Sequence, residues 1–587
     1  MKNWEVQSKL KVKSKKLKVD ELINILLENR GLTKKNEIAE FLNPKLERIT
    51  SKNLGVSQAQ ISKAVSRIKK AIKGGEQIVI FGDYDVDGIC GTAILWEILN
   101  SVGADVMPYI PSRVEEGYGL SKKGIDNLRK KYNGAKIIIT VDNGIVANEA
   151  VEYANSKGLE VIITDHHIPS KKLPNAFAIV HTIKICGAAV AWVLSRELLS
   201  VLGRRFSEES KSVLSFSVQA NRKQITEEHL GLVSLATVAD VMSLTSYNRT
   251  LVKFGLEQIR KTERVGLNKL INLAGIKKEK IGVYELGHII GPRINAMGRI
   301  DEGMESLRLL CTPNVRRAGE LAAKLHATNV KRQELTVESV THAKGIASKS
   351  KKIIIISDKS YNPGIIGLIA GRITEEFYRP SIVISEGEIT SKGSARSVNG
   401  INIIEFIRQA KGLLIDAGGH KGAAGFTIET NKINKLKKIL EKLAEKQIDK
   451  SLLVRKIRID CKLPLEFVNS EVFENVSKLA PFGYGNPEPV FLAENVEVES
   501  HRFVGKDGNH LKIQFKVPSN SAGRQSSKLK IDGIMFGASK SLKLKPNDKV
   551  GIAYSIYENE WLAHRSLGEG GNGNKKLELK IKDIFFK

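Results

Sequence analysis

The stretch Ile78-Val-Ile-Phe-Gly-Asp-Tyr-Asp-Val-Asp-Gly88 joins a short apolar run to three closely spaced aspartates. Two later runs have the same design: Ile137 to Val141 precedes Asp142-Asn-Gly144, and Val161 to Thr164 precedes Asp165-His-His167. Helical stretches separate these runs. Short Ile- and Val-rich runs that alternate with helices are typical of a buried parallel sheet. The sequence therefore predicts an α/β domain.

The acids and histidines all follow predicted strands, at the edge where open parallel sheets bind their ligands. Carboxylates gathered in one crevice raise one another's pKa, and divalent cations are the natural compensation. Carboxylates alone suit Mg²⁺ or Ca²⁺, whereas added imidazole shifts the choice toward Mn²⁺ or zinc. Two such ions, about 3.5–4 Å apart, activate water and stabilise the leaving oxygen of a phosphodiester. The pattern thus predicts metal-dependent hydrolysis of a phosphate ester.

Each motif also has a simpler explanation when it is taken alone. The aspartates from Asp83 to Asp87 resemble the start of a calcium-binding loop, but Ile94 occupies the position where that loop needs a glutamate. Asp142-Asn-Gly alone is usually a turn, and His166-His167 alone is usually a surface pair. The joint placement of all three at strand ends favours a site.

The composition favours a polyanionic partner. The chain has 587 residues, 42% hydrophobic and 27% charged, with a formal net charge of +29. Such a surplus attracts nucleic acid, although a lysine-rich proteome explains the charge equally well. The four cysteines show neither zinc-knuckle spacing nor a disulfide framework. With no signal peptide and no apolar stretch of membrane-spanning length, we expect a cytoplasmic protein without membrane contact.

The pattern changes several times along the chain. A second α/β passage begins at Ile353 and contains the glycine-rich stretch Gly418–Gly425, and short alternating segments follow it. Polar loops at 519–527 and 565–574 interrupt the last part. The predicted divisions are residues 1–75, an N-terminal helical segment; 76–247, a parallel-sheet domain; 248–348, a helical connector; 349–450, a second α/β domain; and 451–587, a small β domain.

Taken in order, these motifs resemble the RecJ family of single-strand-specific exonucleases, within the DHH phosphoesterase superfamily. The resemblance covers nearly the whole chain, and an ordered set is far more specific than any single motif. It rests on Gly82–Gly88, Val141–Gly144, Asp165–His167, Ala239–Leu244 with Asn248-Arg249, Gly291–Arg299, Gly393–Ser397, Gly418–His420 with Gly425, Pro481–Pro487, and the opening Asn29–Leu32 and Phe41–Pro44.

The resemblance implies a site that holds two Mn²⁺ or Mg²⁺ ions and hydrolyses phosphodiesters without a covalent protein intermediate. Catalytic roles are implied for three residues near the ions. His167 would face the scissile phosphate, Asp165 would ligate an ion or orient its neighbour, and Asp87 would be a ligand or a supporting acid. The implied metal ligands are Asp83, Asp85, Asp142, His166 and Asp240.

The second α/β domain resembles the DHH-associated domain, which closes over the substrate. The glycines would let backbone amides approach an anion, although a tight structural turn explains them too. Two arginines would bind the DNA backbone or, alternatively, form helix-end salt bridges. The implied substrate contacts are Arg293, Arg299, Arg396, Ser397, Gly418, Gly419 and His420.

The C-terminal domain resembles an oligonucleotide-binding barrel (OB domain), where a basic groove and aromatic residues follow a single strand. Its candidate contacts are Arg502, Lys506, His510 and Lys512. The fold class is therefore α/β: a parallel-sheet DHH domain and a second α/β DHH-associated domain joined by helices, with a C-terminal OB-like β-barrel. One departure lies near the site, where Ala178-Ile-Val-His181 runs almost directly into Ile185–Ala191 and shortens a loop that is longer in the family.

The resemblance implies a monomeric exonuclease that degrades single-stranded DNA from the 5′ end to mononucleotides, in DNA repair and recombination. A helicase and a single-strand-binding protein are the implied partners. One rival is a phosphatase of the same superfamily that acts on short oligonucleotides or phosphoadenosine, although it would need neither the barrel nor the basic charge. The other rival is a catalytically dead replication scaffold, but every acid of the motifs is present.

Overall fold

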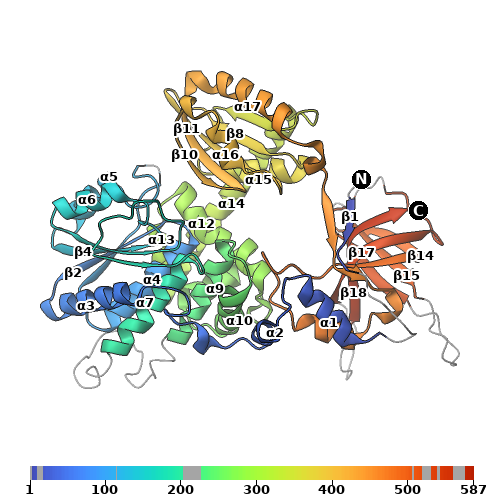
Figure 1. The fold of residues 1–587 in the computed structure, drawn as a ribbon, viewed down its shortest axis with the longest axis horizontal. Helices are drawn as coiled ribbons and strands as arrows, with labels where there is room; N and C mark the ends of the chain where they lie inside the picture. Colours follow the sequence, from blue (N-terminus) through green and yellow to red (C-terminus); the bar gives the residue numbers. More distant parts are fainter. Residues whose placement is uncertain are drawn as a thin grey trace. The chain divides into compact units, whose positions relative to one another are not determined.

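The structure is a computed structural model that describes residues 3–8, 17–113, 115–202, 226–505, 508–517, 530–538, 542–559 and 576–586. The chain divides into two compact units (Figure 1), one of residues 45–455 and one that combines residues 1–44 with 456–587. The expected N-terminal segment 1–75 is thus shared between the units. Lys506 and the polar loops at 519–527 and 565–574 lie outside the described residues. Among the described helices, none is long and apolar enough to cross a membrane.

Five parallel strands form the first sheet, in the order β3-β2-β4-β5-β6. The strands predicted at Ile78, Ile137 and Val161 are confirmed, and they pair directly with one another. The two edge strands have only four residues each, too short an apolar run to be recognised in the sequence. The bounds are β2 (Gln77–Gly82), β3 (Val106–Tyr109), β4 (Ala135–Val141), β5 (Glu160–Asp165) and β6 (Ala178–His181).

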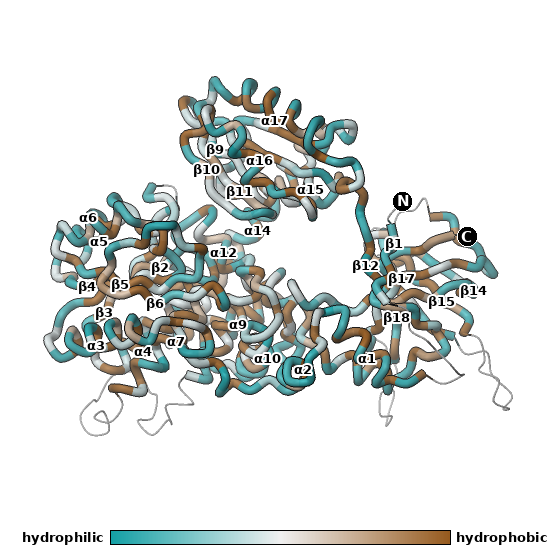
Figure 2. Tube along the Cα trace, viewed as in Figure 1, coloured by the Kyte–Doolittle hydropathy of each residue, from teal (hydrophilic) through white to brown (hydrophobic). Residues whose placement is uncertain are grey.

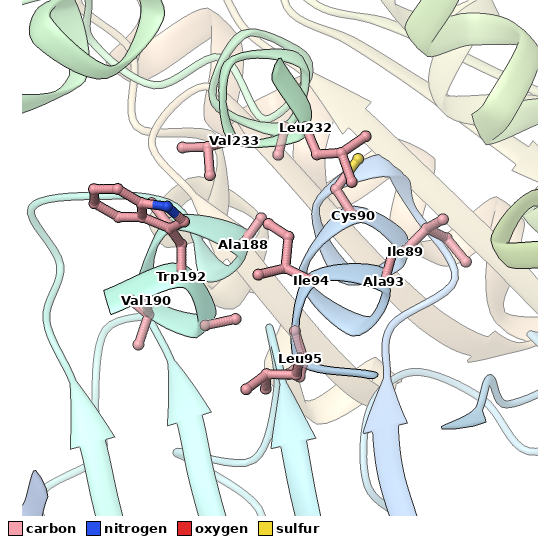
Figure 3. Packing of buried hydrophobic residues seen from close by; sticks show 14 of the residues in the cluster. Ile89, Cys90, Ala93, Ile94, Leu95, Ala188, Val190, Trp192, Leu232 and Val233 are labelled. Carbon is pink, nitrogen blue, oxygen red and sulfur yellow. The ribbon is translucent and has the colours of Figure 1, made fainter. Parts of the chain in front are cut away.

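Alternate residues of β2 face two different helical layers, which is why this run is apolar throughout. Ile78 and Ile80 share a core with α3 (Gln58–Gly74), α4 (Val86–Ser101) and α7 (Gly187–Leu202). Val79 and Phe81 share another with α5 (Lys122–Lys131) and α6 (Asn148–Ser156). Figure 3 shows the first core from close by, with side chains of α4, α7 and α9 (Leu230–Ala239) packed together.

The passage after Asn248 is helical, as its amphipathic pattern predicts. Its longest element is α14, which has 32 residues and leads to the second α/β domain. The elements are α10 (Ser246–Arg260), α11 (Val265–Leu273), η2 (Lys278–Lys280), η3 (Glu285–Ile290), α12 (Gly291–Ile300), α13 (Met304–Cys311) and α14 (Val315–Ile346).

The second sheet has the order β10-β11-β9-β8-β7, in which only β7 and β8 are parallel. The glycine-rich stretch forms the β10–β11 hairpin, with Gly418 opposite Gly425. Hydrophilic and hydrophobic residues alternate along α17 (Figure 2), and its apolar residues join the core of this domain. The bounds are β7 (Ile354–Asp358), α15 (Ile366–Phe377), β8 (Ser381–Ser385), β9 (Thr390–Arg396), α16 (Ile403–Arg408), β10 (Leu414–His420), β11 (Ala423–Glu429) and α17 (Ile433–Gln447), with short 3-10 turns η1 (Leu46–Arg48), η4 (Lys411–Leu413), η5 (Thr430–Lys432) and η6 (Lys450–Leu453).

The other unit is built on a sheet of the order β13-β14-β15-β16-β18-β17, which the pairing of β14 with β17 closes into a barrel. Residues of α1, α2 and α18 join the barrel core. A short N-terminal strand, β1, runs parallel to β12. The bounds are β1 (Asn3–Val6), α1 (Val19–Glu28), α2 (Lys35–Leu42), β12 (Lys456–Ile459), β13 (Cys461–Lys462), η7 (Leu465–Phe467), α18 (Ser470–Ser477), β14 (Phe491–Val504), β15 (His510–Lys516), β16 (Lys530–Met535), β17 (Lys549–Asn559) and β18 (Lys576–Phe586).

Candidate active site

The carboxyl ends of β2, β4 and β5 bring the three acidic motifs to one edge of the first sheet. These strands are adjacent and parallel, so the residues that follow them meet. Asp83, Asp142 and Asp165 are all buried there. Asp240, the residue that ends α9, reaches the same place, since its carboxylate lies 3.6 Å from His166 Nε2. The motifs that the sequence placed in one crevice therefore come together.

The start of α4 fixes the first motif. Asp85 caps this helix, because its Oδ1 accepts hydrogen bonds from the backbone N–H groups of Asp87 and Gly88 at 2.9 and 3.0 Å. The N–H of Val86 donates to Asn295 Oδ1 at 3.0 Å, which ties this turn to α12. The positive end of α4 thus lies beside the carboxylates and favours negative charge there.

The second motif is held in a strained conformation. Asp142 has a φ of 63°, in the left-handed region that residues other than glycine rarely adopt. The start of α7 approaches it so closely that a Cβ on Gly187 would lie 2.6 Å from the Asp142 Cβ. Position 187 therefore requires glycine, and the packing of α7 keeps the Asp142 carboxylate directed into the cluster.

Asp87 and Asp165 use their carboxylates to organise the site. Both oxygens of Asp87 accept hydrogen bonds at 2.7 Å from the N–H groups of Gly187 and Ala188, the first residues of α7. Asp165 accepts from Ile145 N–H through Oδ2 and from His167 through Oδ1. This geometry favours the supporting role for Asp87 and the orienting role for Asp165 among the alternatives that the sequence left open.

Acids of these motifs, together with His166 and His167, form sets of ligand atoms close enough to share a cation. Within each set the atoms lie within 4.8 Å of one another. His166 Nε2 and Asp142 Oδ1 are 3.1 Å apart and occur together in one of these sets. The sets found among the described residues are Asp83, Asp85 and Asp142; Asp87, His166 and Asp240; and Asp142, His166 and His167.

The electrostatics show that this cluster lacks a compensating charge. Burial raises the pKa of Asp83, Asp85 and Asp142, and the charges of neighbouring aspartates raise it further. The same two causes raise the pKa of Asp240 to about 8. Burial lowers the pKa of His166, so its imidazole is neutral and has a lone pair free to bind a metal.

Two buried atoms at the centre of the cluster support a metal site independently. Asp142 Oδ1 and His166 Nε2 are shielded from solvent, yet neither has a hydrogen-bond partner among the described residues. An unpaired buried polar group is costly and calls for an explanation such as a bound ion. The carboxylates suit Mg²⁺ or Mn²⁺, and the neutral imidazole favours Mn²⁺ of the two. The donor set therefore fits these ions.

His167 points its ring to the rim of the cluster. Its Nδ1 is 2.8 Å from Asp165 Oδ1, and its Nε2 is 3.1 Å from the Tyr118 hydroxyl. Burial opposes the charged ring, but the hydrogen bond to Asp165 and the charge of that residue outweigh it and raise the pKa of His167 to about 9. His181, the last residue of β6, donates to the His167 carbonyl oxygen at 2.7 Å and holds the backbone of the motif.

A second cluster consists of arginines and is built around α12 and α14. Burial, followed by repulsion from Arg113 and Arg332, lowers the pKa of Arg299 to about 10. Burial also lowers the pKa of Arg293, Arg332 and Arg396. Arg293 and Arg299 donate to the backbone carbonyls of Ile289 and Gly364. Among the described residues neither forms an ion pair, so the salt-bridge alternative is not supported.

The structure does not bring all predicted substrate contacts to the acidic cluster. The Ser397 hydroxyl donates to the carbonyl of Ile401, within the turn after β9. Gly418, Gly419 and His420 are exposed on the β10–β11 hairpin, and no hydrogen bond or ion pair among the described residues joins them to the acids. In the barrel, Lys512 pairs with Glu578 at 3.5 Å, and His510 packs its ring against Phe536.

Several residues at the site were not predicted from the sequence. Arg113 lies over the Tyr84 ring at 5.2 Å, and Tyr118 contacts His167. Both come from the loop between β3 and α5. An aromatic residue flanked by glycines, as in Gly117-Tyr118-Gly119, is a signal that could have been noticed. The roles of Asn295 and Arg332 could not have been predicted from the sequence, because they depend on how α12 and α14 pack.

Models of three protein families match the chain in order. The DHH family, N-terminal domain, matches residues 77–237; the DHHA1 domain matches residues 350–446; and the RecJ OB domain matches residues 459–583. A parallel sheet with an acid and histidine cluster at its edge, followed by a DHHA1 domain, defines a DHH-family protein. The barrel, which the RecJ OB domain matches, narrows the choice of protein within the DHH family.

Comparison with curated proteins then identifies the family. The single-stranded-DNA-specific exonuclease RecJ of Bacillus subtilis is 30% identical, over 99% of this chain and 70% of that protein. The protein of the same name from Escherichia coli is 32% identical, over 86% of this chain and 89% of that protein. The chain therefore belongs to the RecJ family.

Solved structures agree with this assignment. RecJ from Thermus thermophilus in complex with Mn²⁺ has a TM-score of 0.78 and 29% identity, and the match covers 100% of this chain and 80% of that one. RecJ from the same organism in complex with Mg²⁺ has a TM-score of 0.73 and 28% identity, covering 100% of this chain and 78% of that one. The predicted fold class and family are confirmed.

Proposed function

We propose that this chain is an exonuclease that hydrolyses single-stranded DNA from a free 5′ end and releases mononucleotides, with two Mn²⁺ or Mg²⁺ ions. The observation that carries the proposal is the acid and histidine cluster at the edge of the first sheet, where Asp142 Oδ1 and His166 Nε2 lie buried and 3.1 Å apart, neither with a hydrogen-bond partner in the described part of the chain. Family membership supports the substrate and the polarity.

The proposed ligands are Asp83, Asp85, Asp142, His166 and Asp240. When bound, the ions supply Lewis-acid activation of water and stabilise the charge on the leaving oxygen. Asp87 and Asp165 hold the ligand-bearing segments in place through the hydrogen bonds described above. His167, oriented by Asp165 and carrying a raised pKa, donates a charge-assisted hydrogen bond to an oxygen of the scissile phosphate.

The arginine cluster is proposed to bind the phosphates of the strand that leads to the scissile bond. Guanidinium groups suit phosphates because their planar N–H donors match phosphate oxygens. Arg293, Arg299 and Arg396 belong to this group, with Ser397, Gly418, Gly419 and His420 as further contacts on the second α/β domain. The barrel would hold the strand beyond them, with Arg502, Lys506, His510 and Lys512 as contacts.

The divisions proposed from the sequence assign the chemistry to residues 76–247, substrate closure to 349–450 and strand binding to 451–587, with 248–348 as connector. The cellular role follows from the same proposal: a monomer in the cytoplasm that removes single strands during DNA repair and recombination. A helicase that exposes the strand and a single-strand-binding protein would be its partners.

The test uses the full chain with Mn²⁺ and single-stranded DNA blocked at the 5′ end or at the 3′ end. We expect nucleotides to be released only when the 5′ end is free, and no release by the Asp142→Ala variant. Blunt duplex should be resistant. Release from the other end, or equal digestion of blunt duplex, would contradict the proposal. Dinucleotides serve as the control substrate, because preference for them would indicate the small-substrate phosphatase instead.

A further inference from the structure

Tyr118 belongs to a short segment that is fixed at both ends and free to turn between them. On one side, the Glu116 carboxylate accepts hydrogen bonds from the Tyr109 hydroxyl at 2.9 Å and from Asn127 at 3.2 Å. On the other side, Leu120 is buried in the core that β2 shares with α5. Only Gly117, Tyr118 and Gly119 lie between these anchors.

Both glycines have backbone angles that favour glycine, with φ of +86° at Gly117 and +67° at Gly119. A Cβ at Gly117 would meet nothing within 4 Å. The Tyr118 side chain is 55% exposed and meets the Tyr84 ring only edge to face, with centroids 6.2 Å apart. The backbone can therefore change its angles here, and the phenol ring is not locked into a core.

The hydroxyl of Tyr118 nevertheless occupies a specific position, 3.1 Å from His167 Nε2. An imidazole nitrogen makes one strong hydrogen bond, in the plane of the ring. Because Nδ1 is taken by Asp165 at 2.8 Å, Nε2 is the only remaining position from which His167 can bind a phosphate oxygen. Nε2 therefore cannot make a full-strength hydrogen bond to the tyrosine and to the phosphate at the same time.

We propose that Tyr118 is a latch on His167, whose hydroxyl occupies Nε2 in the free protein and is displaced by an oxygen of the scissile phosphate. The inference rests on the proposed function, since it takes a phosphodiester as the displacing group. The glycines on either side supply the rotation that displacement needs, while Asp165 keeps the ring in place. In the free protein the tyrosine hydroxyl is the hydrogen-bond partner of Nε2, and it therefore competes with the substrate for this atom.

Removing a competitor should strengthen the binding of single-stranded DNA, whereas removing a residue that supports the site should weaken it. Tyr118→Phe keeps the ring and removes the hydroxyl. An intramolecular hydrogen bond contributes about 0.5–1.5 kcal/mol, so its loss should lower the Kd and the KM for single-stranded DNA by about two- to tenfold. The kcat should not fall. Tyr284→Phe is the matched control, because Tyr284 is similarly exposed, at 64%, but packs against His288.

The experiment measures two quantities with Mn²⁺ and the full chain: the Kd for a single strand with hydrolysis-resistant phosphorothioate linkages, and the KM and kcat for the normal strand. Tighter binding by Tyr118→Phe, absent when the same change is made in a His167→Gln background, would support the latch. A higher KM, a lower kcat or an unchanged Kd in Tyr118→Phe would overturn it while leaving the proposed function intact. Failure of the unsubstituted protein to bind or cut any strand would overturn both.

Discussion

The acidic cluster and the arginine cluster are two versions of one physical situation. Each gathers buried or half-buried groups of like charge, and in each burial, followed by repulsion from like-charged neighbours, makes the charged form unfavourable. The aspartates respond with raised pKa values and the arginines with lowered ones. Glu97, in contrast, is a buried charge with partners: it is held between Arg264 at 2.6 Å and His229 at 2.8 Å.

The difference between the clusters lies in the ligand that each one needs. The acids surround two unpaired atoms within a few ångströms, which suits small ions bound at fixed points. The arginines are spread over α12, α14 and β9 and bond mainly to backbone carbonyls, which leaves other N–H donors available to an extended polyanion. A buried cluster of like charge thus indicates the charge of its missing partner, and its geometry indicates the partner's size.

The largest expected effect comes from Asp142→Asn, which keeps the shape of the side chain and removes its charge. Losing a ligand that two of the three sets of metal-binding atoms share should lower kcat/KM by at least about 1,000-fold, equivalent to about 4 kcal/mol. The metal-free variant should be more stable than the parent, because like charges are removed and asparagine tolerates a positive φ. Kinetics with Mn²⁺ and thermal unfolding with EDTA measure the two effects. If the metal-free variant melted lower, the acids would not be repelling one another.

The second effect concerns metal and pH together. An ion at 100 times its Kd should stabilise the protein by about 2.7 kcal/mol, measured as a higher Tm with Mn²⁺ than with EDTA. Because the pKa of Asp240 is raised to about 8, the metal-free folded state binds more protons than the unfolded state from about pH 4 to pH 8. Its stability therefore falls as pH rises through that window.

Mn²⁺ should reverse this trend, since it binds the deprotonated ligands. Measuring the Tm at pH 5 and pH 8, with and without Mn²⁺, tests the direction of this pH dependence. A Tm that rose with pH in EDTA would show that the carboxylates are compensated without metal.

The acidic cluster was largely predictable from the sequence, and the arginine cluster was not. Asp83, Asp142 and Asp165 directly follow apolar runs, so the parallel sheet alone is enough to bring them to one edge. The supporting bonds of Asp87 to α7 depend on how a helix 100 residues later packs. The arginines lie on α12, α14 and β9, and the relative placement of these elements has no local signal in the sequence. A helix-end salt bridge explained Arg293 and Arg299 equally well from the sequence, but the described part of the structure shows no ion pair for either residue.

Two arginines of the same helix, α14, differ in their surroundings and should differ in their effect on DNA binding. On α14, Arg332 has a buried Nε for which no described residue is a hydrogen-bond partner, whereas Arg316 is 90% exposed and pairs with Glu320 at 3.0 Å. Arg332→Gln should weaken binding of single-stranded DNA about tenfold and reduce the salt dependence of log Kd by about one unit. Arg316→Gln should change Kd by less than about twofold. Equal effects of the two changes would mean that binding follows overall charge rather than this cluster.

The smallest effect is expected where α12 supports the first acidic motif. Asn295→Ala leaves the Val86 N–H, in the first turn of α4, without its 3.0 Å partner, which costs about 1 kcal/mol. Because this turn carries Asp85 and Asp87, a loss of that size should lower kcat by a few-fold and leave the Kd for DNA nearly unchanged. Asn268→Ala is the control: Asn268 donates to the Thr262 carbonyl at 3.1 Å and lies on α11, so it should lower the Tm similarly without changing kcat. If both variants lost the same activity, the contribution of Asn295 would be to global stability, and the acidic cluster would be set by its own sheet without help from α12.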